Sequence, residues 1–543
     1  MIRSTVSLVF LLWLDVNFLD AQFILPAQDE ALLRRSKRHT SNTRADIENV
    51  RNLLKGFLKL SADVPLTPKR RSNFGSRPIG YKIIDRTEYA VNKKILNEVF
   101  ESDLVLTLPQ MKDIMSDFQR RISNQDHQIS KRKAIVGDGF RWPNQIVPYV
   151  LKETDSEWRK LILNGIRKWE AETCIRFVER TNETDYVYVF RGAGCYSSVG
   201  RIGGRQYASI GYGCESGGIV AHELGHALGF WHEQSRPDRD KYININEEHI
   251  FRGTKGNFEK RRDIADLDTP YDFGSVMHYG PQAFSDDWNY LTIETKDHRF
   301  QHTIGQRHDL SFIDVKEANL LYCKDRCRVK LNCLYGGYED PRNCAICKCP
   351  TGLAGRRCES IPVSTSHCGG ELTALSAWQT LKSNTTGRCY WRISAPVDKV
   401  HFEVIDTSYS CESSCADNYL EIKHSTNLQQ TGFRQCCNAA PGSFISETNQ
   451  IYIISNAQKA PAEFELRYIA ASARSALPKP PPAQWNGGGL TALIGAENGI
   501  DSTLEQYVIK QLPNTLRNFG RTRGNPWTGI ENIVKSLLIN KNK

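Results

Sequence analysis

The sequence has little apolar material that could hold it in a membrane. Its early apolar run, Val6 to Leu14, is too short to span a bilayer, and no later stretch is long and apolar enough. We therefore expect residues 1–21 to be a signal peptide and the protein to be secreted and soluble, without a transmembrane segment. Cysteine is also missing before Cys174, although the 543 residues contain sixteen. In the extracellular space most of these cysteines should form disulfides.

Neither sign of charge dominates the composition. Lysine and arginine number 71 against 61 aspartates and glutamates, which gives a formal net charge of +10. This excess is modest for the length, and a secretory signal argues against nucleic acid as a partner. We expect no nucleic-acid binding and at most a weak preference for acidic matrix polymers or anionic surfaces.

One short stretch has the pattern of a metal site. His222 and His226 are four residues apart, so on a helix both imidazoles point from one face toward the same ion. Glu223 follows the first histidine, where its carboxylate can reach a metal-bound water. Gly229 can adopt a positive φ, which ends the helix and brings His232 back as a third ligand. Three protein ligands leave one position open, as in catalytic zinc sites.

The shorter HExxH pattern can arise by chance, and a pair of surface histidines would then be the simpler explanation. The added Gly229 and His232 make a coincidence much harder to obtain. We therefore expect one catalytic Zn²⁺ per chain.

The flanking residues extend the pattern. His232 runs into Glu233 and an Arg-Pro-Asp-Arg-Asp string, and Ser275-Val-Met277-His-Tyr279 follows about forty residues later. Together these motifs resemble the astacin family of metzincin peptidases, of the tolloid-like modular type. On sequence alone Met277 and Tyr279 could equally be core residues.

The resemblance assigns a role to each residue of the pattern. It implies three zinc ligands, His222, His226 and His232, with Glu223 as general base. Met277 would form a hydrophobic floor under the metal, and Tyr279 would be a further ligand that swings away to stabilise the transition state. Glu233 would pair with the new N-terminus after activation.

Residues 22–132 are polar and would form a poor independent domain, so we interpret them as a propeptide. Phe100-Glu-Ser-Asp103 is similar to the family's FxGD motif, whose aspartate occupies the open zinc position. Ser102 stands where that motif has glycine. An activating protease is expected to cut at Lys131-Arg132-Lys133, because the following Ala134-Ile-Val-Gly resembles mature astacin starts; Arg35 to Arg38 is a second basic site.

The peptidase domain is predicted to span residues 133–323, as an α+β fold with a central zinc cleft. Residues 158–169 have the apolar spacing of a helix, and residues 175–180 and 186–190 resemble strands. Four cysteines allow three connectivities; the resemblance implies Cys174–Cys323 and Cys195–Cys214. Asn182 begins a glycosylation sequon.

Residues 324–360 hold six cysteines in too few residues for an apolar core, so disulfides must stabilise them. The spacing resembles an EGF-like module, which implies the pairs Cys327–Cys344, Cys333–Cys347 and Cys349–Cys358. A second zinc site is the competing interpretation, but a secreted protein favours disulfides.

Residues 366–470 alternate like the strands of a β-sandwich and resemble a CUB domain. Cys368–Cys389 is the implied pair; the pairing of the next four cysteines stays open. Asn418 stands where calcium-binding relatives have aspartate, so we do not predict calcium. Asn384 begins a second sequon. Residues 471–543, a proline- and glycine-containing linker and basic tail, are expected to be largely disordered.

Arg307 lies between the methionine turn and Cys323. In similar astacins a basic residue in this part of the chain lines the primed side of the cleft. The resemblance therefore implies a bidentate pair with a substrate carboxylate just past the scissile bond. The alternative is that Arg307 is a solvated surface arginine.

These features predict a secreted zinc endopeptidase, made as an inactive zymogen, that cleaves extracellular proteins of the matrix, cuticle or egg-envelope type. The alternative is an adhesion or assembly protein that uses its EGF-like and CUB modules and has an inactive peptidase domain. The complete set of three histidines and Glu223 favours the enzyme.

Overall fold

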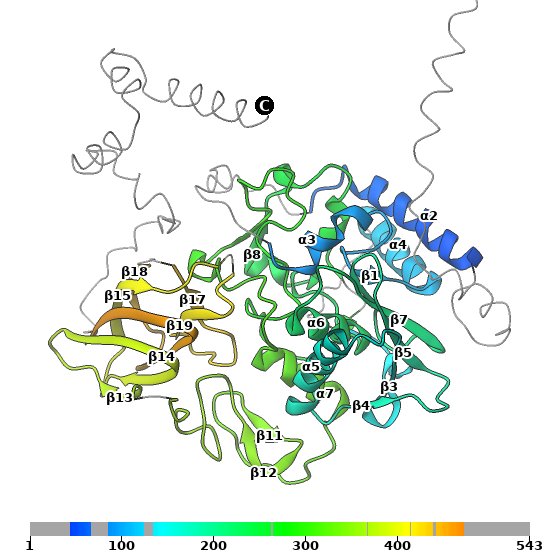
Figure 1. The fold of residues 1–543 in the computed structure, drawn as a ribbon. Coiled ribbons are helices and arrows are strands. Elements are labelled where there is room, and N and C mark those ends of the chain that lie inside the picture. The colour runs from blue at the N-terminus through cyan, green and yellow to red at the C-terminus, as the bar shows by residue number, and fades with distance from the viewer. Residues whose placement is uncertain are drawn as a thin grey trace, which may run out of the picture. The chain divides into compact units, whose positions relative to one another are not determined.

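The computed structural model describes residues 44–66, 85–123, 134–261, 264–265, 267–365, 367–412, 414–437 and 441–471 (Figure 1). The predicted signal peptide, both basic cleavage sites and the tail lie outside these residues. Among the helices of the described residues, none combines the length and apolarity that crossing a membrane requires.

The segment before the predicted peptidase domain contains two amphipathic helices that lie side by side, α2 (Arg44–Ser61) and α4 (Leu108–Ile122). Between them come α3 (Glu88–Asn92), the 3-10 turn η1 (Lys93–Ile95) and the short strand β1 (Leu104–Val105). The apolar faces of α2 and α4 bury Phe57 and Phe118 in one cluster with Trp231 of the peptidase. This segment is therefore stabilised by packing on the peptidase, in agreement with its poor prospects as an independent domain.

The first part of the predicted peptidase domain is a six-stranded sheet in the order β1-β6-β7-β5-β3-β4. Its strands after β1 are β3 (Ile146–Leu151), β4 (Arg176–Glu179), β5 (Tyr186–Phe190), β6 (Cys195–Ser198) and β7 (Arg205–Ile210). All neighbours are parallel except β6 and β7. The edge position beside β6 is occupied by β1, which comes from the preceding segment.

Three helices complete this part: α5 (Ser156–Glu172), α6 (Gly217–Ala227) and α7 (Phe312–Tyr322). Asp155 caps α5 by accepting a hydrogen bond from the Trp158 amide. The apolar spacing expected over residues 158–169 does form this helix, and it buries Trp158 and Trp169. The indole of Trp169 donates to the Ala221 carbonyl at 2.8 Å, so a buried tryptophan fixes α5 against α6.

The lower part has little regular structure. It contains the 3-10 turns η4 (Glu233–Ser235), η5 (Arg239–Lys241), η6 (Glu247–His249), η7 (Lys255–Phe258) and η8 (His298–Phe300), and the two-stranded pairs β8 (Ile243–Ile245) with β10 (Ile293–Thr295) and β2 (Ala134–Ile135) with β9 (Ile264–Ala265). An aromatic cluster that includes Phe258, Tyr271, Tyr279 and Phe284 holds these turns together. The turns η2 (Asp138–Phe140) and η3 (Pro143–Gln145) precede β3.

The small cysteine-rich module has one hairpin, β11 (Tyr338–Asp340) with β12 (Asn343–Lys348). Its six cysteines are joined as Cys327–Cys344, Cys333–Cys347 and Cys349–Cys358, the pairs that the resemblance implies. Since all six sulfurs are in disulfides, they are not available as the second zinc site considered above.

The last described module is a β-sandwich. Its strands are β13 (Gly370–Thr373), β14 (Gln379–Ser394), β15 (Val400–Ser408), β16 (Asn418–Lys423), β17 (Phe433–Gln435), β18 (Gly442–Ile445) and β19 (Gln450–Ala470). The long strands β14 and β19 pair across a register shift between Thr385 and Gly387, and the apolar core packs between the layers. The disulfides are Cys368–Cys389, Cys411–Cys437 and Cys415–Cys436; the last two pairings do not follow from the sequence.

Candidate metal centre

Helix α6 supplies two of the three histidines. Ser216 caps it by accepting from the Gly218 amide at 3.2 Å. The helix lies close to α5 because Gly165 has no side chain, and a Cβ there would lie 2.3 Å from Val220 Cγ1. Gly229 follows with φ of +106°, a conformation that L side chains rarely adopt. The chain then turns back and brings His232 beside His222 and His226.

The metal-binding atoms converge at a fully buried point. His222 Nε2 lies 3.1 Å from His226 Nε2, and Asp103 Oδ2 lies 3.2 Å from the Nε2 atoms of both His222 and His232. His226 Nε2 is 3.6 Å from Asp103 Oδ1. Ligands at ordinary zinc–nitrogen distances in a tetrahedron are roughly 3.3 Å apart. The observed spacings therefore fit one zinc ion with Asp103 in the fourth position.

The outer nitrogens of the histidines fix the rings in the orientation that a metal requires. Nδ1 of His222 donates to the Val276 carbonyl at 2.9 Å, and Nδ1 of His226 donates to the Phe230 carbonyl at 2.8 Å. Because a carbonyl can only accept, these Nδ1 atoms carry the protons and each Nε2 presents its lone pair to the centre. Nδ1 of His232 is 2.7 Å from a carboxylate oxygen of Glu101 instead.

Glu223 is the one acidic group of the site without a partner in the described residues. It is fully buried, and neither carboxylate oxygen has a hydrogen bond. Burial, followed by the nearby carboxylates of Asp103 and Glu88, raises the pKa of Glu223 well above its usual value. An orphaned carboxylate next to three converging imidazoles is suited to accept a proton from a water at the centre.

The methionine turn lies beneath α6 and is positioned by α7. Asp314 in the capping box of α7 accepts from Ser275 Oγ at 2.6 Å and from the Val276 amide at 2.8 Å. Met277 is buried under Gly225, where an added Cβ would lie 2.9 Å from its sulfur. No pattern in the sequence points to Asp314, because its partners lie almost forty residues away.

Tyr279 is close to the histidines but is already engaged. Its ring centroid is 4.6 Å from that of His232, and its hydroxyl donates to the Glu101 carbonyl at 2.5 Å. Glu101 thus contacts two groups of the site, through its backbone and its carboxylate. Sequence reasoning missed this residue, although it lies inside the motif that includes Asp103.

Ser102, where the family motif has glycine, adopts φ of +71°, next to Glu101 at +45°. The backbone therefore follows a left-handed path that glycine would adopt without strain. The substitution leaves Asp103 at the histidines. The amide of Ser197 donates to the Asp103 carbonyl at 2.9 Å, which continues the pairing of β1 with β6.

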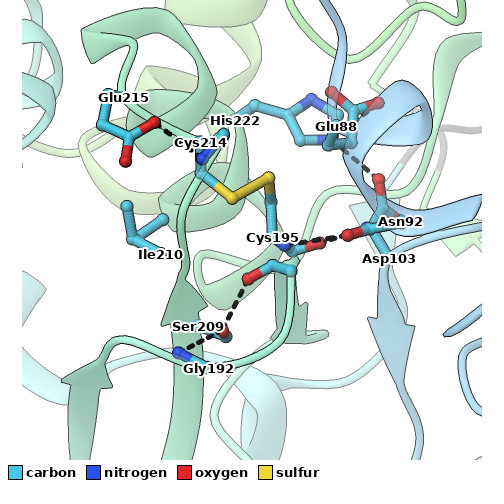
Figure 2. The surroundings of a disulfide bond; sticks show 12 residues. Glu88, Asn92, Asp103, Gly192, Cys195, Ser209, Ile210, Cys214, Glu215 and His222 are labelled. Atoms are coloured by element: carbon cyan, nitrogen blue, oxygen red, sulfur yellow. Dashed lines mark hydrogen bonds and ion pairs between the residues drawn. A yellow bond between two sulfur atoms is a disulfide. The ribbon is translucent and has the colours of Figure 1, made fainter. Parts of the chain in front are cut away.

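Arg307 is buried, with 7% of its surface exposed, so the interpretation as a solvated surface arginine is wrong. Its Nε and Nη2 bind the two carboxylate oxygens of Glu88 at 2.6 and 2.7 Å. Nη1 donates to the carbonyls of His278 and Gln306, each at 2.9 Å. Figure 2 shows Glu88 and Asp103 beside His222, and Asn92 beside Cys195.

The remaining predicted residues lie away from the centre or at its rim. The Glu233 carboxylate is buried and accepts from the Asp272 amide at 2.8 Å and from Arg236 at 3.3 Å. Disulfides join Cys174 to Cys323 and Cys195 to Cys214. Asn182 and Asn384 are both exposed, as a glycan would require.

Residues 136–323 match the family model of the astacin peptidases. The chain is 46% identical over 467 residues to zinc metalloproteinase nas-30 of Caenorhabditis elegans, covering 85% of this chain and 62% of that protein. It is 39% identical over 356 residues to zinc metalloproteinase nas-26 of the same organism, covering 62% of this chain and 85% of that protein.

A solved structure also matches about a third of the chain. It is high choriolytic enzyme 1, a hatching enzyme zinc-protease from the medaka fish Oryzias latipes, with 44% identity and a TM-score of 0.32. The match covers 34% of this chain and 92% of that one. The chain spans less than two thirds of the length of nas-30.

Proposed function

We propose that this chain, which belongs to the astacin family, is a zinc-dependent endopeptidase kept inactive by residues 22–132. The observation that carries the proposal is the convergence of three histidine Nε2 atoms on one buried point beside the unpartnered Glu223. Three protein ligands and one exchangeable position are characteristic of catalytic zinc. The peptidase domain would span residues 133–323, followed by an EGF-like module at 324–360 and a CUB domain at 366–470.

The steps of peptide-bond hydrolysis are assigned to residues described above. A bound Zn²⁺ would polarise the scissile carbonyl and bring the pKa of the attacking water toward ~7. Glu223 takes the proton from that water and passes it to the leaving amine. Tyr279 donates its hydroxyl hydrogen to the developing oxyanion once the Glu101 carbonyl has left. The edge of β6, now paired with β1, offers backbone groups to an extended substrate peptide.

The same contacts explain the inactive form. Asp103 takes the fourth position at the histidines, β1 covers the edge of β6, and Glu101 holds Tyr279. We infer that cleavage by an activating protease at Lys131–Lys133 releases this segment. The new N-terminus then pairs with Glu233.

We also propose a location and a class of substrates. The protein is secreted and carries glycans on Asn182 and Asn384, and its substrates are extracellular proteins of the matrix, cuticle or egg-envelope type. The EGF-like and CUB modules place the peptidase on these substrates. The exposure of both asparagines and the three disulfides of the small module support an extracellular location.

Replacing Glu223 tests the central assignment. The Glu223→Ala variant, activated like the wild type, should keep one zinc per chain and lose peptide hydrolysis by several orders of magnitude, because general-base catalysis alone contributes about 10²–10⁴-fold. Zinc is measured by atomic absorption, and hydrolysis with a quenched fluorescent peptide. A variant that retains zinc and still cleaves efficiently would show that Glu223 is not the base.

A further inference from the structure

A second carboxylate of the propeptide is buried in the cleft, apart from Asp103. The Glu88 side chain is completely buried, and both of its oxygens are bound by the Arg307 guanidinium. Glu88 Oε1 lies 3.8 Å from His222 Nε2, so this pair is adjacent to the metal ligands. The two partners are 219 residues apart in the sequence and belong to the propeptide and the peptidase respectively.

The peptidase fixes the arginine independently of Glu88. Nη1 of Arg307 is held by the carbonyls of His278 and Gln306, and the Arg307 carbonyl accepts from Ser216 Oγ at 3.1 Å. The backbone also passes so close to Gly218 that an added Cβ would lie 1.9 Å from the Arg307 carbonyl oxygen. Nε and Nη2 therefore remain as a preformed fork that presents two parallel N–H donors toward the cleft.

The propeptide, in turn, fixes the glutamate. Asn92, at the other end of α3, donates to the Cys195 carbonyl at 2.5 Å and accepts from the Cys195 amide at 2.9 Å. Asn92 thus acts as a strand neighbour to β6 at Cys195, next to the positions that pair with β1 (Figure 2). Tyr89 packs on Phe284 of the peptidase, with ring centroids 4.8 Å apart. Helix α3 is therefore attached to the cleft at both ends, with Glu88 pointing at the fork.

We propose that the Glu88–Arg307 ion pair is a second lock on the zymogen, independent of Asp103. It anchors α3 over the histidines through two charge-assisted hydrogen bonds. A buried guanidinium that loses its carboxylate is left uncompensated, so removing the charge of Glu88 should loosen this part of the propeptide. This inference rests on the proposed peptidase function.

The lock is tested in a precursor that cannot be activated, with serine at positions 131–133. Glu88→Gln keeps the shape but removes the charge, whereas Glu98→Gln is the matched control. Glu98 also pairs with an arginine, Arg51 at 2.9 Å, but within the propeptide. Residual hydrolysis of a fluorescent peptide should rise at least about tenfold in Glu88→Gln, as expected for breaking a buried charge pair, and stay within about twofold in Glu98→Gln.

Hydrogen exchange of the α3 amides provides a readout that does not depend on activity. Exchange over residues 88–92 should be faster in Glu88→Gln than in the wild type and unchanged in Glu98→Gln. Equal residual activity in Glu88→Gln and the wild type, or an equal rise in both variants, would overturn the lock.

The activated wild-type enzyme separates failure of the lock from failure of the proposed function. If the activated enzyme cleaves neither a fluorescent peptide nor denatured casein, the proposed peptidase function itself is contradicted, whatever the Glu88→Gln precursor shows.

Discussion

Buried carboxylates gather within one cleft, and their partners determine what each can do. Burial raises the pKa of Asp103, but the imidazoles of His232 and His226 hold it well below the usual value. Burial also raises the pKa of Glu88, but the charges of Arg307 and then of His222 outweigh it, so the pKa of Glu88 is lowered. Glu223 has no such partner, and its pKa rises. These different environments separate the pKa values of neighbouring carboxyl groups. Glu223 is thereby suited to accept a proton, whereas Asp103 and Glu88 stay ionised.

Removing the Asp103 carboxylate should give a leaky precursor. In Asp103→Ala the three histidines keep their Nδ1 partners, while the fourth position becomes open to water. Uncut precursor should then hydrolyse a fluorescent peptide well above the wild-type background, although β1 and Glu88 still cover part of the cleft. The measurement uses precursor with serine at positions 131–133, so that no activated enzyme contributes. Full activity of uncut wild-type precursor would exclude the aspartate as a switch.

Individual site residues could be predicted from the sequence where the residues that act together are also close in the sequence. The spacing of His222 and His226, and the positive φ available to Gly229, place three imidazoles together without knowledge of the rest of the fold. Glu88 and Asp314 could not be found in this way, because their partners are 219 and 38–39 residues away and depend on the tertiary structure. The only local signal for Glu101 is its position as an acid within a known motif.

At the scale of elements, helices α5 and α6 are in tight contact through a glycine. Gly165 of α5 faces Val220 of α6, and an added Cβ would lie 2.3 Å from Val220 Cγ1 and 3.1 Å from the Ala221 amide nitrogen. Val220 is β-branched and cannot swing away without moving α6. The position of α6 against α5 therefore depends on the absence of a side chain at Gly165.

Gly165→Ala should therefore destabilise the peptidase although alanine is the better helix former. Overpacking costs about 1–3 kcal/mol, against a gain of up to ~1 kcal/mol in helix propensity. The result should be a thermal transition lowered by a few degrees in calorimetry. Gly139→Ala is the control, since an added Cβ there meets nothing within 4 Å. An unchanged transition in Gly165→Ala would show that the helices can separate freely.

Helices and strands could be predicted from the sequence where their apolar residues recur at a regular spacing. Helix α5 repeats its apolar residues at helical spacing and is predicted correctly, as are the strands near residues 175–180 and 186–190. The lower part of the peptidase has no comparable pattern. Aromatic packing around Tyr271 and Phe284, together with short 3-10 turns, shapes that region, and neither leaves a period in the sequence.

At the scale of the whole molecule, disulfides define the modules. Peptide mapping of the purified protein should find the cysteines between 327 and 358 paired only among themselves, because each bridge closes a loop of 9–17 residues within the module. Non-reducing digestion followed by mass spectrometry gives the pairs. A bridge from this group to the peptidase or to the β-sandwich would contradict the proposed boundaries at 324 and 360.

The Cys174–Cys323 bridge joins the end of α5 to the end of α7 across 149 positions and encloses the whole metal-binding stretch. A single backbone cut anywhere within that span would leave both fragments covalently attached. On a gel run without reductant, such a nicked molecule would migrate with the mass of an intact one. Proteolytic nicking during storage would therefore go unnoticed until the sample is reduced, and a preparation judged intact on an unreduced gel alone could contain a substantial proportion of cut chains.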